Sequence, residues 1–128
     1  MNENEVKPDS ELTAEERAKQ LPTPAGHKIL CAIPQLEATY EGSIIERPDN
    51  FLKREAQATV VLFVVKIGKD AYKDKERFPG GPWCAEGDFV VVRMYAGTRF
   101  TIHGKEFCII HDDQVEAVAQ DPRGIGRA

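Results

Sequence analysis

The stretch GDFVVVRMYAGTRFTIHGKEFCIIHDDQVEAVA, residues 87–119, has the most regular pattern in this chain of 128 residues. An apolar run at 89–94 predicts a strand, and a glycine-centred turn at Ala96-Gly97 follows it. Two alternating segments then flank His103-Gly104. This pair favours a tight hairpin, because glycine tolerates positive φ and histidine enters the left-handed region more readily than most residues.

The end of this stretch, HDDQVEAVA at residues 111–119, has two interpretations. Either Asp112 caps a helix that carries Val115 and Val118, or the segment turns and continues as an edge strand. The pattern alone does not decide between them.

Two further strands are expected earlier in the chain. Residues 59–68, TVVLFVVKIG, form a continuous β-branched and apolar run, which is typical of a core strand covered on both faces. Residues 27–33, HKILCAI, are short, apolar and followed by Pro34, which predicts a strand near a sheet edge. Together the elements predict a small, irregular all-β barrel or sandwich.

The segment between these two strands is unusually long. Residues 34–58 show no sustained alternation, and a connection of this length normally is a functional loop or hides an element such as a helix over 50–58. Two adjacent isoleucines, Ile44 and Ile45, lie in its polar middle. A large apolar pair in such surroundings either anchors the loop to the core or is offered to a partner.

The totals indicate one globular domain that stays in a reducing cytoplasm. About two fifths of the residues are apolar, the formal net charge is −4, and the three cysteines are not in a C-x-x-C spacing. No apolar run is long enough to span a bilayer, and the N-terminus is too acidic for a signal peptide. The acidic balance disfavours nucleic acid as a partner, although a local basic patch is not excluded by it.

The first residues are expected to be an appendage. Thr13 followed by Glu16 makes a capping box, and the good helix formers after it predict a short helix. The prolines in LPTPAG, residues 21–26, end that helix.

The second half of the chain resembles the GroES-type co-chaperonins. Their pattern is a Gly-Asp step with an apolar strand, Tyr-Ala-Gly-Thr, Ile-x-Gly-x-Glu-aromatic, Ile-apolar and then two acidic residues. The matching residues are Gly87, Asp88, Tyr95, Ala96, Gly97, Thr98, Ile102, Gly104, Glu106, Phe107, Ile109, Asp112 and Asp113. The first half fits in layout, with a short strand, a long loop with a glycine-led apolar tip and an apolar strand that ends in glycine.

The resemblance implies a GroES-like β-barrel domain over 24–120. It would carry a mobile loop at about 35–58 and a roof loop at about 69–86. An appendage with a short helix, 1–23, would precede it, and a flexible tail, 121–128, would follow. The roof region DAYKDKERFPGGPWC is similar to the variants carried by tailed bacteriophages, which implies the host cytoplasm for a phage-encoded protein.

The resemblance also implies a function without catalysis. The family forms seven-membered rings that cap an ATP-driven GroEL-type chaperonin and enclose unfolded client proteins. The chain would need no cofactor or metal, because ATP and magnesium belong to the partner. The implied chaperonin contacts are the loop-tip residues Gly42, Ser43, Ile44 and Ile45, although Glu46 stands where the family usually has a third apolar residue.

In this family the terminal strands of adjacent subunits pair. That implies a subunit interface formed by Ile29, Leu30, Val115 and Val118, and it favours the strand interpretation of the C-terminal segment.

Two other classes of function compete with this one. A small barrel could bind single-stranded nucleic acid through the basic loop at 66–77, with Tyr72, Phe78 and Trp83 as stacking rings. Interleaved acidic residues favour a solvated loop instead. The sequence has no catalytic triad order, P-loop, dinucleotide fingerprint or paired-carboxylate spacing, so we expect no enzyme activity.

Overall fold

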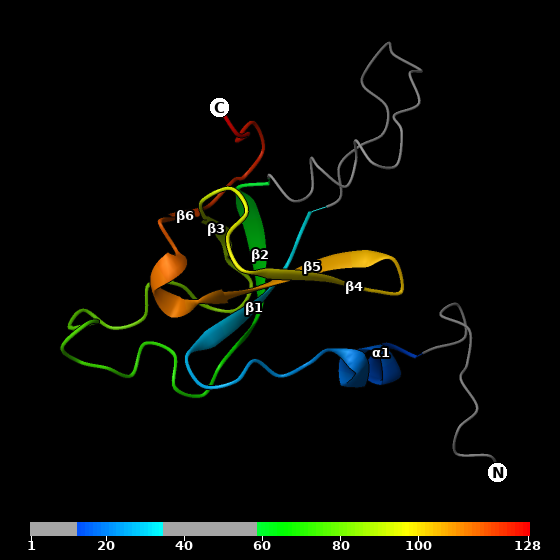
Figure 1. Ribbon diagram of the computed structural model, residues 1–128, viewed down its shortest axis with the longest axis horizontal. Coiled ribbons are helices and arrows are strands. Elements are labelled where there is room, and N and C mark those ends of the chain that lie inside the picture. Colours follow the sequence, from blue (N-terminus) through cyan, green and yellow to red (C-terminus); the bar gives the residue numbers. More distant parts are fainter. Residues whose placement is uncertain (1–12, 35–58) are drawn as a thin grey trace.

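The computed structural model describes residues 13–34 and 59–128. The described residues form the following elements: α1 (Ala14–Gln20), β1 (Lys28–Ala32), β2 (Val61–Ile67), β3 (Phe89–Val91), β4 (Thr98–Ile102), β5 (Lys105–His111), the 3-10 helix η2 (Asp112–Gln114) and β6 (Ala117–Ala119). The strands make one antiparallel sheet in the order β4-β5-β1-β2-β3-β6 (Figure 1). This confirms the predicted small all-β fold with one short helix.

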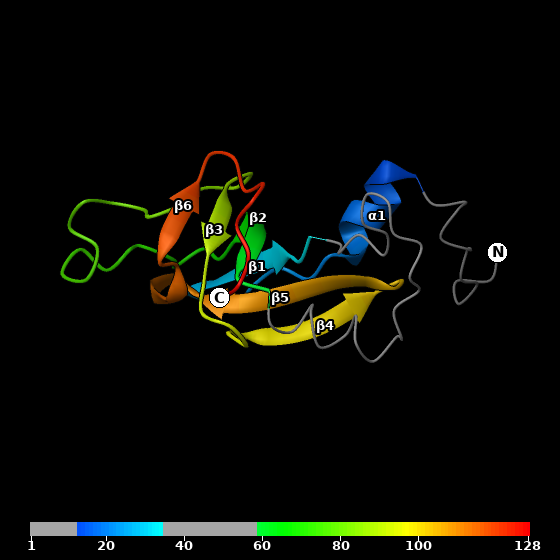
Figure 2. The ribbon, with the colours of Figure 1, turned by 90° about the horizontal axis from the view of Figure 1, so that it is seen from above.

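The β4–β5 hairpin has the tight turn that the sequence predicts. Ile102 pairs with Lys105, so His103 and Gly104 alone form the turn. Their φ angles are 49° and 79°, the two positive values that a two-residue type I′ turn requires. The hairpin extends away from β2 and β3 toward α1 (Figure 2).

Strand β1 is central, so its predicted place near a sheet edge is wrong. It pairs with β2 on one side and with β5 on the other. Three consecutive residues in it, Ile29, Leu30 and Cys31, are fully buried. Pro34 lies beyond the strand's last residue, so it marks where β1 ends and says nothing about the strand's neighbours.

Strand β2 is the core strand that the sequence predicts. Leu62 and Val64 are fully buried, whereas Phe63 and Val65 on the other face are only partly covered. One face of β2 therefore lines the core. The sequence predicted burial of both faces, but consecutive residues on opposite faces are both buried only at Val61 and Leu62.

Strand β3 ends earlier than the sequence predicts, at Val91. Val92 is buried and its N–H donates to the Val60 carbonyl oxygen at 2.8 Å, outside the β3 ladder. A turn follows, in which the Ala96 N–H donates to the Arg93 oxygen at 3.2 Å.

The C-terminal segment combines a turn and a strand. After η2, β6 pairs with β3, with Val118 opposite Val90, and it lies at the edge of the sheet. The edge-strand interpretation of this segment is therefore confirmed.

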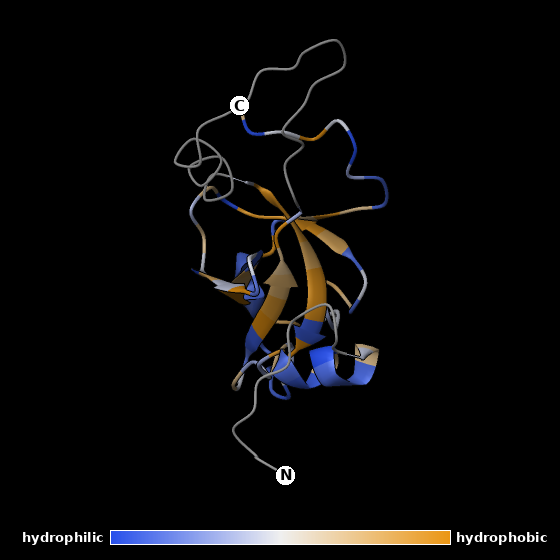
Figure 3. Cartoon of the chain, turned by 90° about the vertical axis from the view of Figure 1, so that its right-hand side faces the viewer, coloured by the Kyte–Doolittle hydropathy of each residue, from blue (hydrophilic) through white to orange (hydrophobic). Residues whose placement is uncertain are grey.

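The core draws on the roof region as well as on the strands. Residues 68–88 contain no helix or strand, yet Ala71, Tyr72, Phe78 and Cys84 are buried in the same cluster as the strand residues. The strands are largely apolar and α1 is mostly hydrophilic (Figure 3). The roof region and α1 lie at opposite ends of the molecule (Figures 1 and 2).

Within residues 13–34 and 59–128, no helix has the length and apolar character needed to cross a membrane.

Candidate functional site

The predicted loop tip, Gly42 to Ile45, lies outside the described residues, so its contacts stay a prediction. The structure does show where segment 35–58 begins and ends. β1 and β2 are adjacent and antiparallel, with Ala32 opposite Phe63, so the two ends of the segment start side by side. Neighbouring antiparallel strands need only about two to five residues to join them. Segment 35–58 is far longer than the fold requires.

Both ends of this segment are fixed to the sheet. At the first end, the Ile33 N–H donates to the Glu106 carbonyl oxygen of β5 at 2.9 Å. At the second end, the Thr59 carbonyl oxygen accepts from Arg99 Nη2 of β4 at 3.3 Å. The segment therefore has a defined base formed by β4, β5 and the neighbouring ends of β1 and β2.

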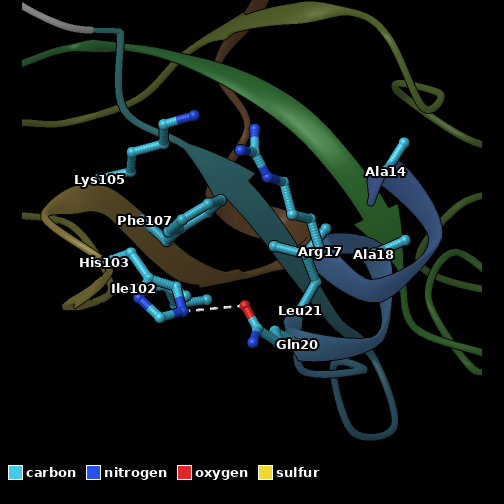
Figure 4. A pocket seen from close by; sticks show the side chains of 9 residues that line it. All are labelled: Ala14, Arg17, Ala18, Gln20, Leu21, Ile102, His103, Lys105 and Phe107. Atoms are coloured by element: carbon cyan, nitrogen blue, oxygen red, sulfur yellow. Dashed lines mark hydrogen bonds between the residues drawn. The ribbon is translucent and has the colours of Figure 1, made fainter. Parts of the chain in front are cut away.

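A groove lies next to this base, between α1 and the β4–β5 hairpin (Figure 4). It encloses about 340 Å³. Ala14, Ala18 and Leu21 line it from the helix side, and Ile102 and Phe107 line it from the hairpin. The groove thus has an apolar floor, which the sequence did not predict.

Polar groups hold the helix in place and surround the groove. His103 Nε2 donates to Gln20 Oε1 at 2.9 Å, and Lys66 Nζ donates to the Leu21 carbonyl oxygen at 3.4 Å. Arg17 and Lys105 extend along one side of the groove (Figure 4). α1 has no buried residue of its own, and these contacts help to attach it to the hairpin and to β2.

The helix itself begins where the sequence predicts. Thr13 is the N-cap and its Oγ1 accepts from the Glu16 N–H at 3.1 Å.

The four predicted interface residues do not share one surface. Ile29 and Leu30 are fully buried within this chain, and Val115 is nearly so. Val118 is 45% exposed on β6, whose outer edge has no neighbour in the described sheet. A contact of Ile29 and Leu30 with a second subunit stays a prediction that their burial does not support.

The apolar surface at β6 continues into the roof region. Trp83 is 45% exposed, and together with Val115 and Val118 it lines a hollow of about 410 Å³. Trp83 belongs to the predicted roof loop, and its place beside β6 was not predicted from the sequence.

The stacking surface proposed for nucleic acid is contradicted by the structure. Tyr72 and Phe78 are 5% and 3% exposed, and their rings meet edge to face with centroids 4.9 Å apart. Arg77 from the basic stretch forms an ion pair with Asp113 and lies over the Phe78 ring. Buried rings cannot stack on bases, so only Trp83 of the three could do so.

Asp112 has a structural role that the sequence did not reveal. It is 2% exposed, and its Oδ2 accepts from the Tyr72 N–H at 3.1 Å. Tyr72 has a φ of 62°, which is uncommon for a residue with a side chain. The hydrogen bond from Tyr72 to Asp112 therefore holds the start of the roof region against the C-terminal turn. It also stabilises the left-handed backbone conformation of Tyr72.

The three cysteines are reduced and buried in the core. Burial raises the pKa of all three thiols, those of Cys31, Cys84 and Cys108. Thiols of this kind are poor nucleophiles and poor metal ligands, because both roles need the thiolate. Among the described residues, no group of three or more histidine, cysteine or acidic side chains is placed to hold a metal ion.

Comparisons with known proteins point to one family. Residues 23–119 match the family described as "Chaperonin 10 Kd subunit". A protein named Co-chaperonin GroES from Caldicellulosiruptor saccharolyticus is 32% identical over 98 residues, which are 77% of this chain and 96% of that protein. A protein of the same name from Chlamydia caviae is 33% identical over 95 residues, 74% of this chain and 87% of that protein. The matched region begins after α1, which is thus an addition to it.

Proposed function

Because this chain belongs to the chaperonin 10 kDa subunit family, that of the GroES co-chaperonins, we propose that it caps a GroEL-type chaperonin through the tip of loop 35–58. The family is not an enzyme family. The capped chamber would enclose unfolded client protein, and ATP with magnesium would act on the chaperonin. The cytoplasm is the proposed place of action.

One observation carries the proposal beyond the family assignment. Segment 35–58 begins after β1 and ends before β2, which are paired neighbours, so it is longer than joining these two strands requires. A long excursion from a fixed base can carry an apolar tip to a surface outside the subunit. Gly42, Ser43, Ile44 and Ile45 supply such a tip.

The energetics suit reversible capping. Burying two isoleucine side chains contributes roughly 3 to 6 kcal/mol. Ordering the loop costs about 1 to 2 kcal/mol for each residue that becomes fixed, so one loop binds weakly. Several loops on one ring gain about 10²- to 10⁴-fold in avidity, because every contact after the first is intramolecular. The cap leaves when ATP hydrolysis changes the chaperonin's affinity for the tips.

We propose the open edge of β6 as one side of the contact between subunits. The outer edge of β6 has no neighbour among the described strands, so it offers backbone hydrogen-bonding groups, and exposed Val118 with the neighbouring Trp83 offers apolar surface to a second copy. Strand β1, which the resemblance places in this contact, has both edges paired within the chain. A closed ring of seven copies stays the proposed assembly.

The proposal is tested by measuring the mass of the assembled protein and its binding to a chaperonin. Native mass spectrometry of the purified protein is expected to give seven times the mass of 14.3 kDa. Interferometry on an immobilised GroEL-type chaperonin is expected to show binding with ATP and little without it. A monomer or dimer together with no ATP-dependent binding would overturn the proposal.

A further inference from the structure

The groove between α1 and the β4–β5 hairpin has no part in the capping proposed above. Its floor exposes the apolar side chains of Ile102 and Leu21, and Phe107 lies at its base. Its wall is a helix that precedes the family match. The family match does not extend to this wall, so the family assignment names no occupant for the groove.

We propose that residues 1–12 of the same chain dock in this groove, with Val6 and Leu12 against its apolar floor. The segment joins the helix at Thr13, whose neighbour Ala14 is itself a lining residue. An extended chain spans at most roughly 3.3 to 3.6 Å per residue, so Val6 can reach about 20 Å from Thr13. The seven residues of α1 span about 10 Å at 1.5 Å per residue, so the helix side of the groove is within that range.

Charge also matches this occupant. Residues 1–12 carry the acidic side chains Glu3, Glu5, Asp9 and Glu11 and one basic side chain, Lys7. The groove is lined by the cations Arg17 and Lys105, and none of its lining residues is a carboxylate. An acidic segment with two apolar side chains fits a groove with an apolar floor and a cationic side.

Docking of this segment would also account for a helix that has no buried residue. Seven residues are too short for an isolated helix to be stable in water. A segment that covers Ala14, Ala18 and Leu21 from outside would give α1 a second apolar contact beyond the hairpin.

The experiment is hydrogen exchange on the full-length protein without any chaperonin, supported by NMR of its isoleucine methyl groups. Val6→Ser with Leu12→Ser is expected to speed exchange of the α1 amides about tenfold or more, since each 1.4 kcal/mol of lost burial is a factor of ten. The same variant should shift the Ile102 methyl signal. The matched control, Asn2→Ser with Asn4→Ser, should change neither, and Lys105→Glu should act in the same direction as the apolar variant.

Three results would overturn the inference. One is unchanged α1 exchange and an unchanged Ile102 signal in Val6→Ser with Leu12→Ser. Another is a change in α1 exchange and in the Ile102 signal that occurs only in the variant Ile44→Ser with Ile45→Ser. This result would make segment 35–58 the occupant of the groove. The third is an effect that disappears when a fully assembled ring is replaced by dilute single subunits, which would assign the groove to a neighbouring copy. None of these results depends on whether the protein caps a chaperonin.

Discussion

Replacing Phe78 by alanine tests whether the roof region is part of the core. Phe78 is 3% exposed, and its ring meets those of Tyr72 and Trp83 edge to face, each with centroids 4.9 Å apart. Phenylalanine-to-alanine changes at such sites cost about 3 to 5 kcal/mol, the lost transfer free energy plus the cavity that remains. The free energy of unfolding should fall by that amount.

Urea unfolding measures this change. The slope for a small protein is about 1 to 3 kcal/mol per molar urea, so the midpoint should fall by at least about 1 M. Trp83 is the only tryptophan of the chain and lies against Phe78, so its fluorescence reports the roof region, while far-UV circular dichroism reports the sheet. The two signals should change together, because both regions share one hydrophobic cluster.

The matched control is Lys75→Ala, an exposed position in the same segment, which should change stability by no more than about 0.5 kcal/mol. All variants are compared at one protein concentration, since subunit association adds to stability. A loss below about 1 kcal/mol for Phe78→Ala would refute the reasoning. So would a tryptophan transition that moves while the sheet transition does not.

Three further changes test other parts of the fold. Gly97→Ala should destabilise by about 2 kcal/mol or more in thermal unfolding, because φ is 77° there and a Cβ would overlap the Ile109 oxygen and lie 2.7 Å from Cys108 Sγ; a stability equal to wild type would contradict this. Asp112→Ala should cost about 1 to 3 kcal/mol by removing the acceptor of the Tyr72 N–H, and Asp112→Asn, which keeps an acceptor oxygen, should cost less; equal losses would contradict it. Burial raises the pKa of the three cysteine thiols, so the unfolded chain loses their protons first as pH rises past about 8.5. Stability should therefore decline from pH 8 to pH 10, and urea midpoints that stay constant over that range would contradict this.

Local features of the sequence predicted what depends on local chemistry. His103-Gly104 gave the hairpin turn, because left-handed backbone geometry is restricted to few residue types. Thr13 and Glu16 gave the start of α1 for the same kind of reason, a side chain that accepts from a free N–H of the first turn.

Features that depend on distant partners were not predictable in this way. β1 is central because β5, about 80 residues later, pairs with its free side, and nothing within residues 27–33 encodes that partner. Tyr72 and Phe78 lie among alternating charges, so the stretch has the composition of a solvated loop although its aromatic rings enter the core. The α1 groove exists only because a helix and a hairpin far apart in sequence lie together.

The candidate site also combines features that the sequence predicts with features that only the structure shows. The resemblance supplied the loop tip and the family, and the described strands supply the fixed base of the loop. The interface at Ile29 and Leu30 was implied by the resemblance alone, and both residues are buried in a strand that pairs on both sides with distant parts of the chain.

The most direct measurement compares two doubly substituted rings for binding to an ATP-loaded GroEL-type chaperonin. In the first, Ile44→Ser with Ile45→Ser removes the apolar tip; in the second, Asp49→Ser with Asn50→Ser changes the same loop without touching the tip. Both rings should keep the native mass of the unaltered protein. The first should bind about 100-fold or more weakly, because each loop loses part of roughly 3 kcal/mol of burial energy and several loops bind at once. The second should bind like the unaltered protein. If the Ile44→Ser, Ile45→Ser ring still binds within about threefold of the unaltered protein, a difference below about 1 kcal/mol, capping through the loop tip is contradicted.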